Sequence, residues 1–295
     1  MGGGLREAGR KQEQLKRTMD RHICCNGKLL TLEQPLVMGI LNVTADSFYD
    51  GGRYNSEKDW LEHAEQLLSE GADIIDVGCM STRPGAKTLP EEEELRIADN
   101  VTRSLATHFP QAILSIDTWR ASVARRTVEN GVAIINDISG GDFDTEMFNT
   151  VADLQAPYIL MHTSGTPDVM QQNTQYGNVV AEVFRYLSER LEKLRLLNVK
   201  DVIVDVGFGF GKTVEQNFEL LRNFSVFKWL DCPLLCALSR KSMLYKTIGC
   251  TPEEALPATV AAHTIALQQG ADMLRAHDVK AAKDAISIFK AAYPK

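Results

Sequence analysis

Two hydrophobic patterns alternate along the chain from Val37 to its end. Short apolar runs rich in β-branched residues are separated by longer stretches in which apolar residues recur every three or four positions. The first pattern is typical of strands that are buried on both faces, and the second is typical of amphipathic helices. Gly71, Gly131 and Gly270 each follow a helical stretch, where a left-handed cap suits glycine.

The pattern predicts eight strands and eight helices. The strands are expected at Val37–Val43, Asp73–Val77, Ile113–Ile116, Val132–Asn136, Tyr158–Met161, Val202–Val206, Pro233–Ala237 and Asp272–Arg275. The helices are expected at Glu57–Glu70, Glu91–His108, Ala121–Asn130, Thr145–Leu154, Val179–Leu197, Val214–Asn223, Pro252–Gln269 and Val279–Ala292. Thr251 with Pro252 and Glu254 forms a start signal for the seventh helix.

Strict alternation of strand and helix predicts an α/β protein with a parallel sheet. Eight units favour a closed (β/α)8 TIM barrel over an open doubly wound sheet. No linker rich in proline or glycine divides the chain, so we expect a single catalytic domain over residues 22–295. Asn26-Gly27 within Ile23–Leu32 predicts a short N-terminal β-hairpin, and residues 1–21 are expected to be a flexible basic extension.

Composition narrows the class of protein. The 295 residues are 44% hydrophobic and 24% charged, which is ordinary for a globular protein. The net charge of −7 argues against a nucleic-acid partner, although residues 1–28 alone carry a net charge of +4. No apolar run reaches the roughly 18 residues of a membrane span, and no apolar core follows the basic start, so we expect no membrane contact and no secretory signal. Six cysteines without a CxxC pair indicate a reduced, cytoplasmic protein.

Polar residues stand at or just after the ends of all eight predicted strands, where a barrel of this type builds its active site. Asp117, Asn136 and Asp205 suit a planar heterocycle with an amidine-like edge, because a carboxylate accepts two parallel N–H bonds from such an edge. Asn42, Arg275 and His277 end the first and last strands, which are neighbours in a closed barrel. With Arg83 they offer an anion site suited to phosphate.

Several residues keep two interpretations. Asp76 ends the second strand but could simply anchor its own loop, and His162 fits either a structural role or a pocket wall. The segment Gly207–Lys212 matches neither GxGxxG nor a P-loop, so it is either a mobile loop or a closely packed one that lets Phe210 lean over a site. The three tryptophans, Trp60, Trp119 and Trp229, are expected to pack against helices.

At this point the motifs resemble those of the dihydropteroate synthase family. The resemblance covers about residues 35–290, with two long signatures and six short ones in the family's order. The segments are Met38–Thr44 with Asp46–Phe48 and Asp50–Gly52, Ser81–Gly85, Ser115–Thr118, Ile135–Asp137, Met161-His162, Gly207–Lys212, Ser239–Ser242 and Arg275–Asp278. Departures from the usual pattern are Ala45 in place of proline, Cys79-Met80 in place of Gly-Glu, and Val206 in place of proline.

The resemblance implies a transferase of folate biosynthesis. Such an enzyme joins p-aminobenzoate to 6-hydroxymethyl-7,8-dihydropterin diphosphate, forms 7,8-dihydropteroate and releases pyrophosphate. Magnesium accompanies the diphosphate, sulfonamides are inhibitors, and the family leads us to expect a cytoplasmic homodimer. The small apolar residues of Ala258–Leu267 on more than one helix face would suit a dimer interface or close packing on neighbouring helices.

The resemblance also assigns roles to residues of this sequence. The pterin would be held by Asp117, Asn136, Asp205 and Lys241. Thr82 and Arg83 would lie near the diphosphate and p-aminobenzoate, Asn42 would contact the metal, and Arg275 and His277 would bind the diphosphate. Ser242 would receive the carboxylate of p-aminobenzoate between Phe210 and Pro84. Among these residues Asp117, Lys241, Arg275 and His277 would form the catalytic set.

Two other classes remain open from the sequence. A pterin-binding domain that transfers a methyl group from methyltetrahydrofolate to a corrinoid would share the barrel and the pterin acids. It would not need the Ser81–Gly85 loop or the Ser239–Ser242 segment, and both are present. A non-catalytic barrel scaffold should have lost several of the polar strand ends, and none is missing.

Overall fold

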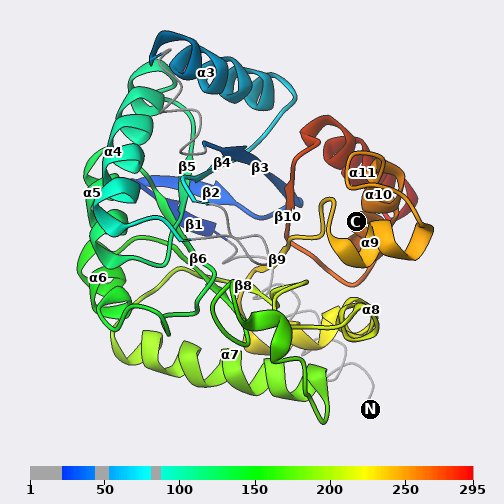
Figure 1. Ribbon diagram of the computed structural model, residues 1–295. Helices are drawn as coiled ribbons and strands as arrows, with labels where there is room; N and C mark the ends of the chain where they lie inside the picture. The colour runs from blue at the N-terminus through cyan, green and yellow to red at the C-terminus, as the bar shows by residue number, and fades with distance from the viewer. Residues whose placement is uncertain (1–21, 44–52, 81–87, 295) are drawn as a thin grey trace, which may run out of the picture.

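The computed structural model describes residues 22–43, 53–80 and 88–294, with the side chains of 53–56 excepted. Its centre is a closed barrel of eight parallel strands in the order β10-β3-β4-β5-β6-β7-β8-β9, surrounded by helices (Figure 1). The predicted (β/α)8 barrel is therefore confirmed. The strands are β3 (Leu36–Asn42), β4 (Ile74–Gly78), β5 (Leu114–Asp117), β6 (Ile134–Asp137), β7 (Tyr158–Met161), β8 (Val202–Asp205), β9 (Leu234–Cys236) and β10 (Met273–Ala276).

The helices follow the strands around the outside of the barrel. They are α3 (Arg53–Ser69), α4 (Glu91–His108), α5 (Ala121–Glu129), α6 (Met147–Leu154), α7 (Val179–Leu196), α8 (Val214–Arg222), α9 (Ser242–Ile248), α10 (Leu256–Gln268) and α11 (Val279–Ala292). Two 3-10 helices, η1 (Met170–Gln172) and η2 (Phe224–Leu230), join them. Gly71, Gly131 and Gly270 have φ angles of 96°, 104° and 92°, so all three predicted left-handed caps are confirmed.

The predicted helix Pro252–Gln269 is wrong in its first turn. The Thr251 amide does donate to Glu254 Oε2 at 3.0 Å, but this contact closes only a turn, and α10 begins at Leu256. Pro257 lacks an N–H group and cannot continue a helix from residue 253, which sets the start of α10 just before it. The sequence pattern also missed α9, whose seven residues are too few to show a helical period.

Alternate side chains of each strand face the helices and the barrel interior. Val37 and Ile75 face outward into a large cluster shared with the helices. Met38 and Ile74 face inward into a separate, smaller cluster. The strands read as continuous apolar runs because both of their faces are buried.

A two-stranded hairpin closes the floor of the barrel. Strands β1 (His22–Cys25) and β2 (Lys28–Thr31) pair antiparallel around Asn26-Gly27, as predicted. Both turn residues have positive φ, 49° and 77°, as a tight hairpin turn requires. The side chains of Ile23, Cys25 and Leu32 join the inward cluster of Met38 and Ile74, so the hairpin seals the end of the barrel where the strands begin.

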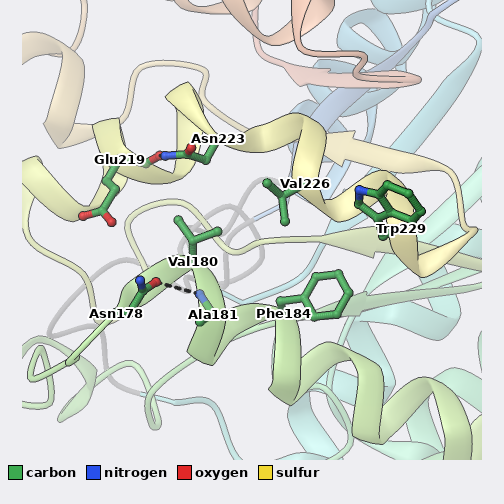
Figure 2. Close-up of a pocket in the computed structure, with 8 residues that line it drawn as sticks. All are labelled: Asn178, Val180, Ala181, Phe184, Glu219, Asn223, Val226 and Trp229. Atoms are coloured by element: carbon green, nitrogen blue, oxygen red, sulfur yellow. Dashed lines mark hydrogen bonds between the residues drawn. The ribbon is translucent and has the colours of Figure 1, made fainter.

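The prediction that all three tryptophans pack against helices is wrong for Trp229. Trp60 is buried, but Trp229 is 80% exposed. Trp229 lines a cavity of about 470 Å³ that opens between α7, α8 and η2, beside Phe184 and Val226 (Figure 2). This cavity lies on the helical shell and contains none of the polar strand ends. Within the part of the chain that the structure describes, no helix has the length and apolar character needed to cross a bilayer.

Candidate active site

The inward positions change from apolar to polar toward the carboxyl ends of the strands. Two residues after an inward apolar side chain, the same strand places a polar one. The pairs are Ile74 and Asp76, Ile134 and Asn136, Ile203 and Asp205, and Met273 and Arg275. Because side chains two apart on a strand share a face, these polar groups form a layer on top of the apolar floor.

Hydrogen bonds across the barrel hold this polar layer together. Arg275 Nε donates to Asp76 Oδ2 at 2.6 Å, and Asn136 Nδ2 donates to the same oxygen at 2.9 Å. Strands β10, β4 and β6 are not neighbours in the sheet, so these contacts can be made only through the interior. Asp76, whose alternative role was a loop anchor, is fully buried at the centre of this network.

Asp117 is the second carboxylate that Arg275 contacts. Arg275 NH2 donates to Asp117 Oδ2 at 2.9 Å, while Asp117 Oδ1 is buried with no hydrogen-bond partner among the described residues. Burial raises the pKa of Asp117 to about 7, with Arg275 opposing the shift and Asp76 adding to it. The free oxygen gives a ligand with an N–H edge a ready acceptor.

Asp205 and Lys241 occupy the opposite side of the mouth. Asp205 Oδ1 accepts a hydrogen bond from the amide of Gly207 at 2.8 Å, and burial raises the pKa of Asp205. Burial lowers the pKa of Lys241 to about 8, against the attraction of Asp205. Lys241 Nζ donates to the carbonyl of Phe208 and lies 4.6 Å from the centre of the Phe210 ring.

The glycine loop Gly207–Gly211 is closely packed, which resolves the two interpretations of this segment. Gly207, Gly209 and Gly211 have φ angles of 68°, 86° and 64°. A Cβ atom at Gly207 would lie 1.9 Å from the carbonyl oxygen of His162, so only glycine fits there. The loop places Phe210 beside Trp119 and Met161 in an apolar rim around the mouth.

The segments after β9 and β10 are tied to each other. Ser239 Oγ accepts the amide N–H of His277 at 3.1 Å and lies 2.9 Å from His277 Nδ1. Arg240 forms a bidentate ion pair with Asp278, with N–O distances of 2.9 and 2.7 Å. Arg240 has a left-handed φ of 54°, and these contacts hold it there. Ser242 then begins α9, directly after Lys241, whose carbonyl accepts the amide N–H of Leu244 at 2.9 Å.

Asn42 ends β3 at the exposed rim. In the sheet register, Asn42 pairs with Gly78 and Gly78 with Asp117. A Cβ atom at Gly78 would lie 2.9 Å from Asn42 Oδ1, so the amide oxygen lies over that glycine. No group of three His, Cys, Asp or Glu side chains among the described residues could hold a metal ion. One exposed amide oxygen fits Mg²⁺ only if most of the other ligands come from substrate and water.

The structure thus brings together most of the predicted site residues. Asp117, Asn136, Asp205, Lys241 and Arg275 meet in one polar layer, and Asn42, Phe210, Ser242 and His277 surround it. Thr82, Arg83 and Pro84 lie outside the described residues, as does the predicted basic extension 1–21.

His162 is surrounded by tyrosine rings, which fits the structural one of its two predicted roles. Its ring packs edge-on against Tyr186 at 4.7 Å and lies 6.0 Å from Tyr176, on the helix side of β7. Burial holds the pKa of His162 well below its ordinary value, so the imidazole is neutral. It lines a cavity of about 440 Å³ together with Ser164, Asn173 and Tyr176, and none of the other polar strand ends lines that cavity.

Comparison with known proteins gives the same family as the motifs. Residues 38–277 match the model of the pterin binding enzymes. The dihydropteroate synthase of Escherichia coli (strain K12) is 40% identical over 267 residues, which are 90% of this chain and 94% of that protein. The chain belongs to the dihydropteroate synthase family. It is an enzyme of the transferase class that makes dihydropteroate.

Solved structures of dihydropteroate synthases share the whole barrel. The enzyme of Xanthomonas albilineans with 4-aminobenzoic acid superposes with a TM-score of 0.86 at 39% identity, covering 93% of this chain and 99% of that one. The Yersinia pestis dihydropteroate synthase in complex with a sulfonamide drug gives a TM-score of 0.85 at 37% identity, covering 92% and 98%.

Proposed function

We propose that this dihydropteroate synthase joins p-aminobenzoate to 6-hydroxymethyl-7,8-dihydropterin diphosphate within the polar layer at the mouth of its barrel. The observation that carries the proposal is the cross-barrel network of Arg275 with Asp76 and Asp117, facing Asp205 and Lys241. It combines carboxylates for a flat N–H edge with cations for an anion, over an apolar floor that excludes water.

The pterin would bind deepest, on the acidic side. Asp205 and the unpartnered Oδ1 of Asp117 accept from its N–H groups, while Asn136 and Lys241 contact its other heteroatoms. A neutral heterocycle that donates two hydrogen bonds to a carboxylate favours the ionised form of that carboxylate. Binding therefore shifts Asp117 from the mixed protonation state of the empty site toward the carboxylate.

The diphosphate would lie at the rim between β3 and β10. Arg275 and His277 bind it there, with Arg83 on the loop outside the described residues. Asn42 would supply one oxygen to a Mg²⁺ ion bound with the diphosphate, and most of the ion's other ligands would be oxygens of substrate and water. When bound, the ion supplies positive charge that weakens the bond to the leaving group.

The p-aminobenzoate would occupy the outer part of the mouth. Phe210 forms one apolar wall and Pro84 another, and Ser242 with the N-terminus of α9 receives the carboxylate. Sulfonamides would compete for this position because their aromatic amine has the same shape as that of p-aminobenzoate.

The reaction is a substitution at the pterin methylene carbon. The C–O bond to the diphosphate breaks first, and pyrophosphate leaves with the electron pair. The amine nitrogen of p-aminobenzoate then forms the C–N bond and loses one proton to the solvent or the leaving group. The protein stabilises the separating charges: Arg275 faces the departing anion, and Asp117 and Asp205 face the cationic pterin. An aromatic amine is neutral at pH 7, so no strong general base is required.

We also infer a cytoplasmic homodimer. All six cysteines are free thiols, which suits a reducing compartment. Ile248, Ile265, Ile288 and Tyr293 are 42–71% exposed on or just after α9, α10 and α11, which lie side by side on the barrel (Figure 1). An apolar surface on adjacent helices is typical of an interface.

One assay tests the proposed reaction. Steady-state release of pyrophosphate must depend on both p-aminobenzoate and the dihydropterin diphosphate, and sustained turnover with either substrate alone would overturn the coupling. Arg275→Ala should weaken binding of the diphosphate substrate far more than binding of dihydropterin. Equal losses for both ligands would count against the anion site.

A further inference from the structure

Lys212 directly follows the glycine loop, and the reaction proposed above gives it no part. Its side chain is only 4% exposed. Lysine is almost never fully buried unless it is paired, because removing an ammonium group from water is costly. The hydrogen-bond partners of Lys212 are main-chain carbonyl oxygens. Its Nζ donates to Gly207 at 2.7 Å and Phe210 at 2.9 Å, and lies 3.5 Å from the carbonyl of His162.

These contacts join both ends of the loop to the end of strand β7. The left-handed backbone at Gly207, Gly209 and Gly211 leaves the loop with one internal main-chain hydrogen bond, from the Phe210 amide to the Gly207 carbonyl at 3.2 Å. The carbonyls of the loop are instead held by side chains. Lys212 binds those of Gly207 and Phe210.

The two intervening carbonyls have other donors. Gln171 Nε2 donates to the Gly209 carbonyl at 2.6 Å, and Lys241 donates to that of Phe208. Lys241 faces the proposed pterin pocket, so substrate competes for its ammonium group. The side chain of Gln171 is exposed, so water competes for its hydrogen bond to the loop. Lys212 is therefore the buried donor that remains when the site is filled.

The consequence reaches the substrate through Phe210. The carbonyl of Phe210 is held by Lys212, and its ring lies in the apolar rim 4.6 Å from Lys241 Nζ. We propose that Lys212 is a positioning residue: its buried amino group cross-links the glycine loop and thereby places Phe210 as the wall of the p-aminobenzoate subsite. The inference rests on the proposed function, which makes Phe210 that wall.

A double-mutant cycle tests the link between the two residues. Lys212→Met keeps an unbranched side chain that is one atom shorter and removes its donors, and Phe210→Ala removes the wall. Each single variant should raise the KM for p-aminobenzoate about tenfold, since small displacements in a site have effects of that order. The KM for the dihydropterin diphosphate should change less than threefold. The double variant should resemble Phe210→Ala alone, because Lys212 has nothing left to position.

Two results would overturn the inference. If the two effects on the KM for p-aminobenzoate multiply in the double variant, Lys212 does not act through Phe210. If Lys212→Met lowers kcat for both substrates with both KM values unchanged, its role is only to keep the fold. If Phe210→Ala itself leaves the KM for p-aminobenzoate unchanged, the proposed function has misplaced that wall, which is a separate failure.

Matched variants complete the design. Lys200→Met removes an exposed lysine and should leave all constants unchanged. Lys212→Gln keeps two of the three donors, and it should restore the KM for p-aminobenzoate most of the way toward that of the unchanged protein. If Lys212→Met does not fold, Lys212→Leu, which also has no donor, replaces it in the same cycle with the same criteria.

Discussion

Burial changes the pKa values of the acidic and basic side chains at the mouth of the barrel. The pKa of Asp117 rises to about 7 and that of Lys241 falls to about 8, because both side chains lose water. The empty site therefore holds groups that change charge near neutral pH. A ligand with complementary hydrogen bonds changes those charges when it binds.

Asp205→Asn should weaken binding of dihydropterin about tenfold to a hundredfold, since a charge-assisted contact of roughly 1–3 kcal/mol is lost. Isothermal titration calorimetry with dihydropterin measures this loss of affinity. Asp168→Asn, on an exposed loop position, serves as the control for loss of one negative charge. Unchanged binding by Asp205→Asn would remove Asp205 from the pterin pocket.

Binding of dihydropterin should release a proton at pH 6. At that pH, below its folded pKa of about 7, Asp117 is mostly protonated in the empty enzyme, and the ligand selects the carboxylate. Lys241, with a pKa of about 8, is already protonated at pH 6 and takes up none. Affinity should therefore rise as pH increases from 6 to 7, and the rise should end as Lys241 begins to lose its proton toward pH 8.

Calorimetry in two buffers of different ionisation enthalpy counts the released protons. Asp117→Asn should reduce the release, because Asp205, whose pKa burial also raises, is then the remaining carboxyl that faces the pterin. The same apparent binding enthalpy in both buffers would contradict the prediction.

The sequence predicted the chemical types of the site residues, but it left Asp76 with the alternative role of a loop anchor. Its signal was present: Asp76 follows the inward Ile74 by two positions, as Asn136 follows Ile134. What the sequence could not provide was the partner, because the Arg275 that contacts Asp76 lies 199 residues away.

The elements of the fold were predicted closely because each is short, regular and bounded by clear signals. Most strand ends fall within one or two residues of the prediction. The exceptions are α9, whose seven residues show no period, the start of α10, which Pro257 sets, and the start of α3, which lies at Arg53 and not at the predicted Glu57. Exposure of Trp229 was beyond prediction, since η2 is too short and irregular to define a buried face.

The glycine loop offers a matched test of packing against backbone conformation. Gly207 and Gly27 both have positive φ, 68° and 77°, but only at Gly207 would a Cβ atom meet another group, at 1.9 Å. Gly27→Ala should cost about 1 kcal/mol in the free energy of unfolding. Gly207→Ala should cost roughly 3 kcal/mol, because a clash with main chain adds to the strain.

Urea unfolding curves compare the two variants. Equal losses would show that the contact at His162 relaxes without cost.

For the whole molecule, the surface of α9–α11 should join two copies. Light scattering at micromolar concentration should give about twice the 32.7 kDa of one chain. Ile265→Glu places a charge on a side chain that is 42% exposed on α10, so the mass should fall to that of a monomer. Ala262, in the same helix, is buried within its own chain and is unsuitable as a probe.

Leu196→Glu is the control, because Leu196 is 78% exposed at the end of α7, away from these helices. It should leave the mass unchanged. A dimer that survives Ile265→Glu would place the interface elsewhere.

The closure of the barrel has a consequence for synthesis on the ribosome. Strand β10 pairs with β3, joining Met273 to Leu36 across almost the full chain, and β10 also carries Arg275. Until these last residues emerge, the nascent chain has two open sheet edges, and Asp76 and Asp117 lack their cation. Enzyme activity and protection from edge-to-edge aggregation therefore arise together, in the final step of folding.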